Sequence, residues 1–273
     1  MAQNPVINKF GAATGANRGP GSGGFVAPPP SAGELQQMYN QPAYAPPSTP
    51  GISRYMTLDD VVVRVGAMLA VLLASGATAW VLAPNPSVYL PILLIGLVGG
   101  LGLGLYMAFT MKANAVTALI YSACEGLLLG AISRVFEDRY HGIVIQAVSG
   151  TVMVAAGMLF VYRIGAIRVT PKFTRVVVGA TIGVFGLMLV NLIAYLFHPG
   201  GLGLRDGGTL AIVFSLVCIV IASMNLVMDF DMIERGIRNG APEKFAWYAA
   251  FGIMVTLIWL YIEILRLLSY MRR

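Results

Sequence analysis

The sequence is short of charged residues. Of its 273 residues, 11% are charged and 57% are hydrophobic, and the mean hydropathy is +0.76. In a soluble globular protein about a quarter of the residues are charged. The composition therefore excludes a soluble globular enzyme and indicates a membrane protein.

Histidine and cysteine are also scarce. The two histidines, His141 and His198, lie in links between apolar runs, without the Ser, GxGD or HExxH neighbours that intramembrane proteases use. The two cysteines, Cys124 and Cys218, lie inside apolar runs, where a disulfide framework has no purpose. We therefore expect no enzymatic activity, no cofactor and no fixed metal ion.

Residues 1–56 differ in composition from the rest of the chain. They contain the runs GPGSGG, PPP and YAPPSTP, which favour neither helix nor strand, and no apolar stretch that could form a signal peptide. We expect a disordered, cytoplasmic N-terminal tail. Alternatively, Tyr39, Tyr44 and the paired prolines could bind a protein partner as a polyproline helix.

Beyond residue 56 the chain consists of apolar runs close to the ~20 residues that cross the hydrocarbon of a bilayer. The runs are too long and too continuous for the alternating strands of a membrane β-barrel. We therefore predict an all-α integral membrane domain, a seven-transmembrane-helix bundle, at residues 57–273. The predicted spans are 61–83, 88–111, 114–136, 142–162, 176–197, 209–230 and 245–271.

The net charge of +6 comes mainly from Lys and Arg in the links between the runs, which is typical of contact with anionic lipid headgroups rather than nucleic acid. The links on the side of the N-terminus contain eight basic residues, and those on the other side contain three. This asymmetry predicts a cytoplasmic N-terminus in the plasma membrane. Arg266, Arg272 and Arg273 oppose this orientation, unless the last helix re-enters the membrane instead of crossing it.

Glycines recur at a spacing of four residues in three of the runs. Helices in lipid associate where small residues let their backbones approach, so each such face is expected to pack against a neighbouring helix. The expected packing residues are Gly96, Gly100 and Gly104 in the second run, Gly126 and Gly130 in the third, and Gly179 and Gly183 in the fifth.

Ionisable residues inside the runs are the candidate functional groups. Glu125 lies near the middle of the third run, where a charged carboxylate costs several kcal/mol unless it is paired, protonated or hydrated. Alternatively, Glu125 is neutral and hydrogen-bonded to backbone, Asn191 or Asn225. Arg64, one turn into the first run, is expected to extend toward the headgroups.

Two further acidic positions lie in the last two runs. The sixth run ends with Asp229 and Asp231, which point to opposite faces of a helix, so we expect only one of them to face the bundle. In the seventh run Glu263 precedes Arg266 by three residues, a spacing that allows a local ion pair.

The sequence resembles the Bax inhibitor-1 (transmembrane Bax inhibitor motif) family, in particular its bacterial members. The resemblance rests on the seven spans, the EGLLLG segment, the D-x-x-x-I end of the sixth span at Asp229 to Ile233, and the LYIEIL segment. It implies a pH-sensitive calcium leak governed by two acidic side chains that share a proton. Asp229 matches the first, where calcium could bind transiently, and Glu263 matches the second. Lys112 matches the family's basic partner on the second helix.

The spacing of this pair bears on its geometry. Asp229 and Glu263 are 34 positions apart, and Glu263 lies about 27 Å along a helix that begins near Phe245. They meet only if that helix begins outside the membrane, or if it tilts or re-enters. Alternatively, Glu125 replaces one member as a relay. Two other functions stay open: a proton-coupled solute transporter, and a membrane stress-response scaffold without transport activity.

Overall fold

The computed structural model describes residues 31–33, 54–198 and 200–272, so most of the expected N-terminal tail lies outside the described residues. From residue 58 on, the described chain forms seven helices that are all long and apolar enough to cross a membrane. The predicted all-α fold and its seven spans are confirmed. The helices are α3 (Leu58–Leu82), α4 (Pro86–Thr110), α5 (Ala115–Arg139), α6 (Ile143–Arg163), α7 (Pro171–Phe197), α8 (Thr209–Arg238) and α9 (Phe245–Met271).

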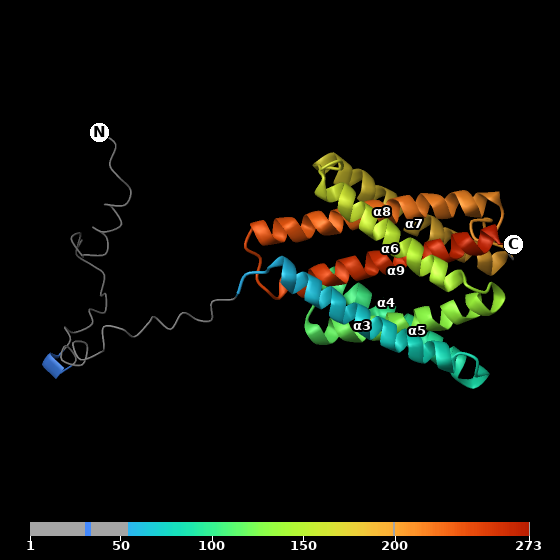
Figure 1. The fold of residues 1–273 in the computed structure, drawn as a ribbon, viewed down its shortest axis with the longest axis horizontal. Helices are drawn as coiled ribbons and strands as arrows, with labels where there is room; N and C mark the ends of the chain where they lie inside the picture. The colour runs from blue at the N-terminus through green and yellow to red at the C-terminus, as the bar shows by residue number, and fades with distance from the viewer. Residues whose placement is uncertain (1–30, 34–53, 199, 273) are drawn as a thin grey trace, which may run out of the picture. The chain divides into compact units, whose positions relative to one another are not determined.

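Polar residues and prolines at the helix starts mark where the spans begin. Thr57 and Asp60 form a capping box before α3, and the Thr170 side chain caps α7, whose first residue is Pro171. A proline suits this position because the first helical N–H has no partner within the helix. Consecutive helices run in opposite directions through the bundle (Figure 1). We call the end where α3, α5, α7 and α9 begin the N-side and the opposite end the C-side.

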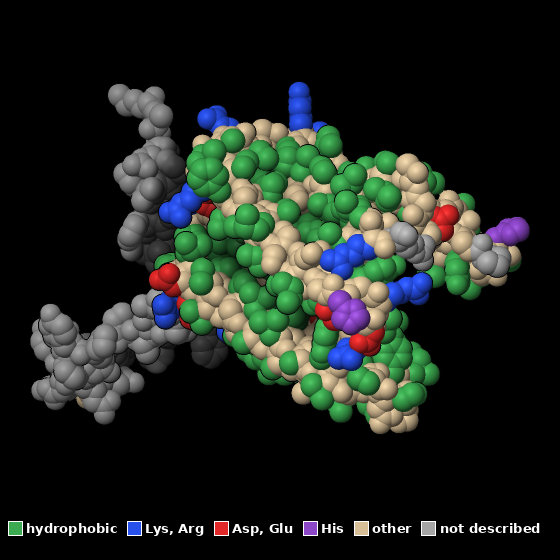
Figure 2. Space-filling model, turned by 45° about the vertical axis from the view of Figure 1, so that its right-hand side comes forward, with side chains coloured by type: hydrophobic (Ala, Val, Ile, Leu, Met, Phe, Trp, Pro, Cys, Tyr) green, Lys and Arg blue, Asp and Glu red, His purple; other side chains and the backbone are tan. Residues whose placement is uncertain are grey.

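The last helix, α9, lies in the middle of the bundle and packs against α3, α5, α6 and α8 (Figure 1). It is continuous from Phe245 to Met271, and Arg272 beyond it donates to the carbonyl oxygens of Tyr140 and His141 at the C-side. The alternative in which the last helix re-enters the membrane is therefore wrong. Hydrophobic side chains are spread over the lateral surface in view, where charged side chains are few (Figure 2), as expected of a bundle surrounded by lipid.

Glycines bring α5 into close contact with two neighbours. A Cβ on Gly130 would lie 2.8 Å from backbone atoms of Gly76 in α3, and a Cβ on Gly96 would lie 2.9 Å from the carbonyl oxygen of Cys124. Gly126 lies against the backbone of α3 in the same way, and Gly100 and Gly104 of α4 lie against side chains of α5. Backbone contact of this kind replaces the hydrophobic driving force that helices lack in lipid.

Gly179 and Gly183 do not form the expected packing face. No described atom of another element lies within 4 Å of a Cβ built at either position, and both residues are exposed. Their side of α7 faces away from α8, the helix on which α7 packs. Four-residue glycine spacing alone does not tell which face of a span meets a neighbour.

Gly130→Ala should destabilise the bundle by about 1–3 kcal/mol, because the added methyl group meets backbone that cannot rotate away. The measurement is the free energy of unfolding in mixed detergent micelles. The control is Gly183→Ala, which adds the same methyl group where no described atom is within 4 Å. Equal effects of the two substitutions would contradict the α3–α5 contact.

Candidate functional site

Asp229 lies on α8, at the interface with α9. Its carboxylate accepts a hydrogen bond of 2.6 Å from the Thr256 hydroxyl, and it lies against Gly252, where a Cβ would be 3.2 Å from Oδ1. Among the described residues no Lys, Arg or His forms an ion pair with it. At 1.5 Å per residue, Asp229 lies about 14 Å from the N-side end of α8 at Arg238. Asp229 is therefore a carboxyl group held by a hydroxyl group, without a counter-ion.

Asp231 has a different environment from Asp229. Its carboxylate pairs with Arg235 at 2.6 Å, one turn further along the same helix. The neighbouring Glu234 accepts a 2.5 Å hydrogen bond from the Tyr162 hydroxyl and pairs with Arg238. Of the two aspartates, Asp229 is therefore the one that contacts α9, and Asp231 belongs to the charged N-side surface.

Glu263 lies on α9 between two arginines. Its side chain is 1% exposed, and Arg205 donates to both of its oxygens at 3.0 and 3.3 Å. Arg266 donates to Oε1 at 3.3 Å, so the ion pair expected from the spacing is present. Ser215 Oγ and Trp259 Nε1 are buried beside this carboxylate, but neither makes a hydrogen bond of normal geometry. Glu263 with Arg205 and Arg266 forms a charged cluster, which we call the Glu263 clamp.

The structure does not bring Asp229 and Glu263 together. Glu263 lies about 27 Å from the N-side start of α9 at Phe245, roughly 13 Å deeper than Asp229 measured along the helix axes. Their hydrogen bonds go to Thr256 and to Arg205, respectively. The prediction of a direct Asp229–Glu263 pair, which the family resemblance implies, is therefore wrong. The antiparallel packing of α8 and α9 places the two residues at different distances from the N-side.

Glu125 lies on α5 against α4. A Cβ on Gly100 would lie 2.7 Å from its Oε1, and the Tyr121 side chain, one turn earlier, is within reach of the carboxyl group. Neither expected amide partner reaches it, because Asn191 accepts from the Leu202 N–H and Asn225 donates to Thr181. Glu125 lies about 15 Å from the start of α5 at Ala115, a depth similar to that of Asp229. The arrangement with Glu125 as a relay therefore stays a hypothesis.

The basic residues near the N-side differ from expectation. Arg64 is held in ion pairs instead of lying free among the headgroups: its side chain is 12% exposed, it pairs with Glu243 at 2.7 Å and with Asp60 at 3.4 Å, and it lies over the ring of Trp247. Lys112 is exposed in the α4–α5 link, and no described acidic side chain pairs with it. The part of the chain that the structure describes contains no cluster of His, Cys, Asp and Glu able to hold a metal ion.

A family model described as "Bax inhibitor 1 like" matches residues 4–273, which is nearly the whole chain. No curated protein matches the sequence.

Arg205→Ala should destabilise the protein strongly, because breaking a buried ion pair costs about 3–5 kcal/mol and leaves Glu263 with Arg266 alone. Adding Glu263→Gln should restore much of this loss, since the remaining side chain is neutral. Unfolding free energies of the two single variants and the double variant give the coupling energy. The control is Arg134→Ala, which breaks an exposed pair with Asp138 and should cost at most ~1 kcal/mol. Additive effects at Arg205 and Glu263 would contradict the clamp.

Proposed function

The chain belongs to the Bax inhibitor 1 like family, and from this premise we propose that it forms a pH-sensitive pathway through which calcium leaks down its gradient. The observation that carries the proposal is the position of Asp229. Its carboxyl group lies between two packed membrane-spanning helices, and its described partner is a hydroxyl group rather than a cation. Such a group can exchange a proton for a cation without first breaking an ion pair.

The chemistry of Asp229 supports both ligands. An ionised carboxylate in apolar surroundings is costly, and either a bound proton or a bound cation removes that cost. Carboxylate and hydroxyl oxygens are ligands that a hard cation such as calcium accepts. Asp229 and Thr256 together would therefore bind a calcium ion transiently, with protons as competitors. The proposed site has no fixed metal, because two protein oxygens are far fewer than the six to eight that calcium prefers.

The Glu263 clamp would close the pathway toward the C-side. It joins the α7–α8 link to α9, since Arg205 belongs to the link and Glu263 and Arg266 belong to the helix. A buried ion pair is well suited to a switch, because neutralising one partner strands the other charge. We propose that release of Arg205 from Glu263 opens this end of the bundle.

We also propose that the N-side faces the cytoplasm of a plasma membrane. The exposed Lys and Arg of the N-side links exceed those of the C-side links, as the positive-inside tendency requires. Of the C-terminal arginines that oppose this orientation, Arg266 pairs with Glu263 and Arg272 donates to backbone carbonyls and to Gln146. Their positions follow from these contacts and give little information about orientation.

Glu125 favours a second candidate, a proton-coupled transporter of a small solute. It lies about as far from the N-side end of its helix as Asp229 does, but on the α4–α5 side of the bundle. The described residues thus offer two carboxyl groups inside the spans that have no described cationic partner. Two such groups could relay protons. A transporter would show saturable counterflow of one solute, and Glu125→Gln would abolish it. Neither function involves bond-breaking chemistry by the protein, and we propose that it is not an enzyme.

The calcium leak is tested with the full-length protein in liposomes that contain a calcium-sensitive dye. The flux should exceed that of empty liposomes and change as the pH is varied from acidic to slightly basic. Asp229→Asn should flatten this pH dependence at least severalfold, because an amide cannot exchange the proton. Asp231→Asn makes the same change two residues along, at a surface ion pair, and should retain the pH dependence. A wild-type flux equal to that of empty liposomes at every pH would contradict the proposal.

A further inference from the structure

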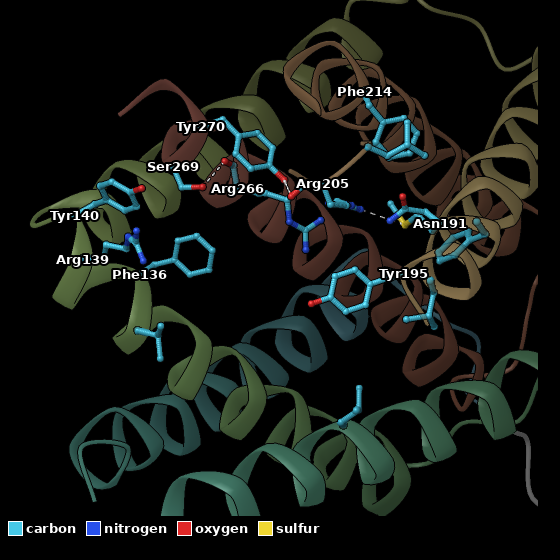
Figure 3. Close-up of a pocket in the computed structure, with 16 residues that line it drawn as sticks. Phe136, Arg139, Tyr140, Asn191, Tyr195, Arg205, Phe214, Arg266, Ser269 and Tyr270 are labelled. Atoms are coloured by element: carbon cyan, nitrogen blue, oxygen red, sulfur yellow. Dashed lines mark hydrogen bonds between the residues drawn. The ribbon is translucent and has the colours of Figure 1, made fainter. Parts of the chain in front are cut away.

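A large cavity opens at the C-side of the bundle, away from Asp229. Its volume is about 960 Å³, and its walls come from α4, α5, α7, α8, α9 and the α7–α8 link. Figure 3 shows Arg266 and Tyr195 directed toward the middle of the opening, with Arg139 at the end of α5 and the following Tyr140 at its edge. The cavity thus joins a basic, tyrosine-bearing rim to the interior of the membrane domain.

The rim is positively charged. Arg139, Arg205 and Arg266 line the cavity, and no Asp or Glu among the described residues does. Glu263, behind the wall, neutralises one charge between Arg205 and Arg266. Arg139 is exposed, and no described acidic side chain pairs with it.

The carboxylates near Arg139 are occupied elsewhere. Asp138 pairs with Arg134 at 2.9 Å, and Glu137 accepts hydrogen bonds from the backbone of Gly142 and Val144 at the start of α6. Two positive charges therefore remain at the mouth of the cavity. A guanidinium group can donate two parallel hydrogen bonds to two oxygens of one phosphate group. The two positive charges at the mouth therefore suit a phosphate group.

The lower part of the cavity is apolar and reaches deep into the membrane domain. Leu97 lies about 17 Å from the C-side start of α4 at Pro86, and Phe185 lies about 18 Å from the C-side end of α7 at Phe197. Leu97 and Leu192 are 49% and 58% exposed, so this wall is continuous with the lipid-facing surface. The cavity therefore extends from the C-side rim about 17 Å into the membrane domain.

We propose that this cavity binds an anionic phospholipid. The phosphate group lies between Arg139 and Arg266 at the rim, and an acyl chain lies against Leu97, Phe185 and Leu192. A soluble phosphate compound would use the rim in the same way but would leave the apolar depth of the cavity unfilled. The proposal does not depend on whether the protein conducts calcium.

The test uses the full-length protein in nanodiscs of phosphatidylcholine with a minor fraction of phosphatidylglycerol. After mild delipidation, native mass spectrometry should detect retained phosphatidylglycerol in preference to phosphatidylcholine. Arg139→Glu should reduce the retained fraction about tenfold, because it removes one favourable charge at the rim and adds a repulsive one. Arg163→Glu is the matched control: Arg163 is likewise the exposed last residue of its helix, at the N-side end.

A second variant and a second probe separate a lipid from a free phosphate compound. Leu97→Trp should fill the apolar depth, reduce retained phosphatidylglycerol and leave folding intact, because Leu97 is half exposed. Glycerol 3-phosphate, which carries the headgroup chemistry without acyl chains, should bind far more weakly than phosphatidylglycerol. Equal binding of glycerol 3-phosphate would overturn the lipid proposal in favour of a soluble phosphate ligand. Equal loss of phosphatidylglycerol in Arg139→Glu and Arg163→Glu would overturn the site itself.

Discussion

The antiparallel pairing of α8 and α9 is the constraint on which both candidate sites depend. The two helices are joined by the short link of residues 239–244, so the depth of each residue is set by its distance from that link. Asp229 and Thr256 lie at comparable distances on either side of it and therefore meet across the helix interface. Glu263 lies two turns beyond Thr256 and meets the α7–α8 link instead.

The acidic side chains inside the spans differ in their partners. Arginines reach the carboxylates of Glu263 and Asp231. The described neighbours of Asp229 and Glu125 are hydroxyl groups, glycines and apolar side chains. Because a charge without a counter-ion is costly inside a span, we propose that Asp229 and Glu125 are the groups whose protonation responds to a cation or to pH. The clamped Glu263 would respond only if its arginines moved.

Much of the fold could be predicted from the sequence, because each span must by itself be long and apolar enough to cross the lipid. The lengths of the apolar runs located all seven helices. Acidic residues are costly inside such runs, which singled out Glu125, Asp229 and Glu263 as candidates. Partners distant in sequence could not be predicted. Arg205 lies in a link 58 positions from Glu263, and Arg64 lies 179 positions from Glu243. Thr256 was overlooked, although a single Thr in the apolar first half of α9 was a usable signal. Gly130 and Gly183 each follow another glycine at the same four-residue spacing, so this pattern could not predict that only Gly130 packs against a neighbouring helix.

The central claim is that Asp229 exchanges its proton independently of Glu263. Infrared difference spectroscopy of the protein in bilayers, recorded between acidic and basic pH, measures this directly through the carbonyl band of a protonated carboxyl group. The account predicts a titrating band that disappears in Asp229→Asn and persists, at the same pH, in Glu263→Gln. Loss or a large shift of that band in Glu263→Gln would show that the two residues share a proton and would contradict the account.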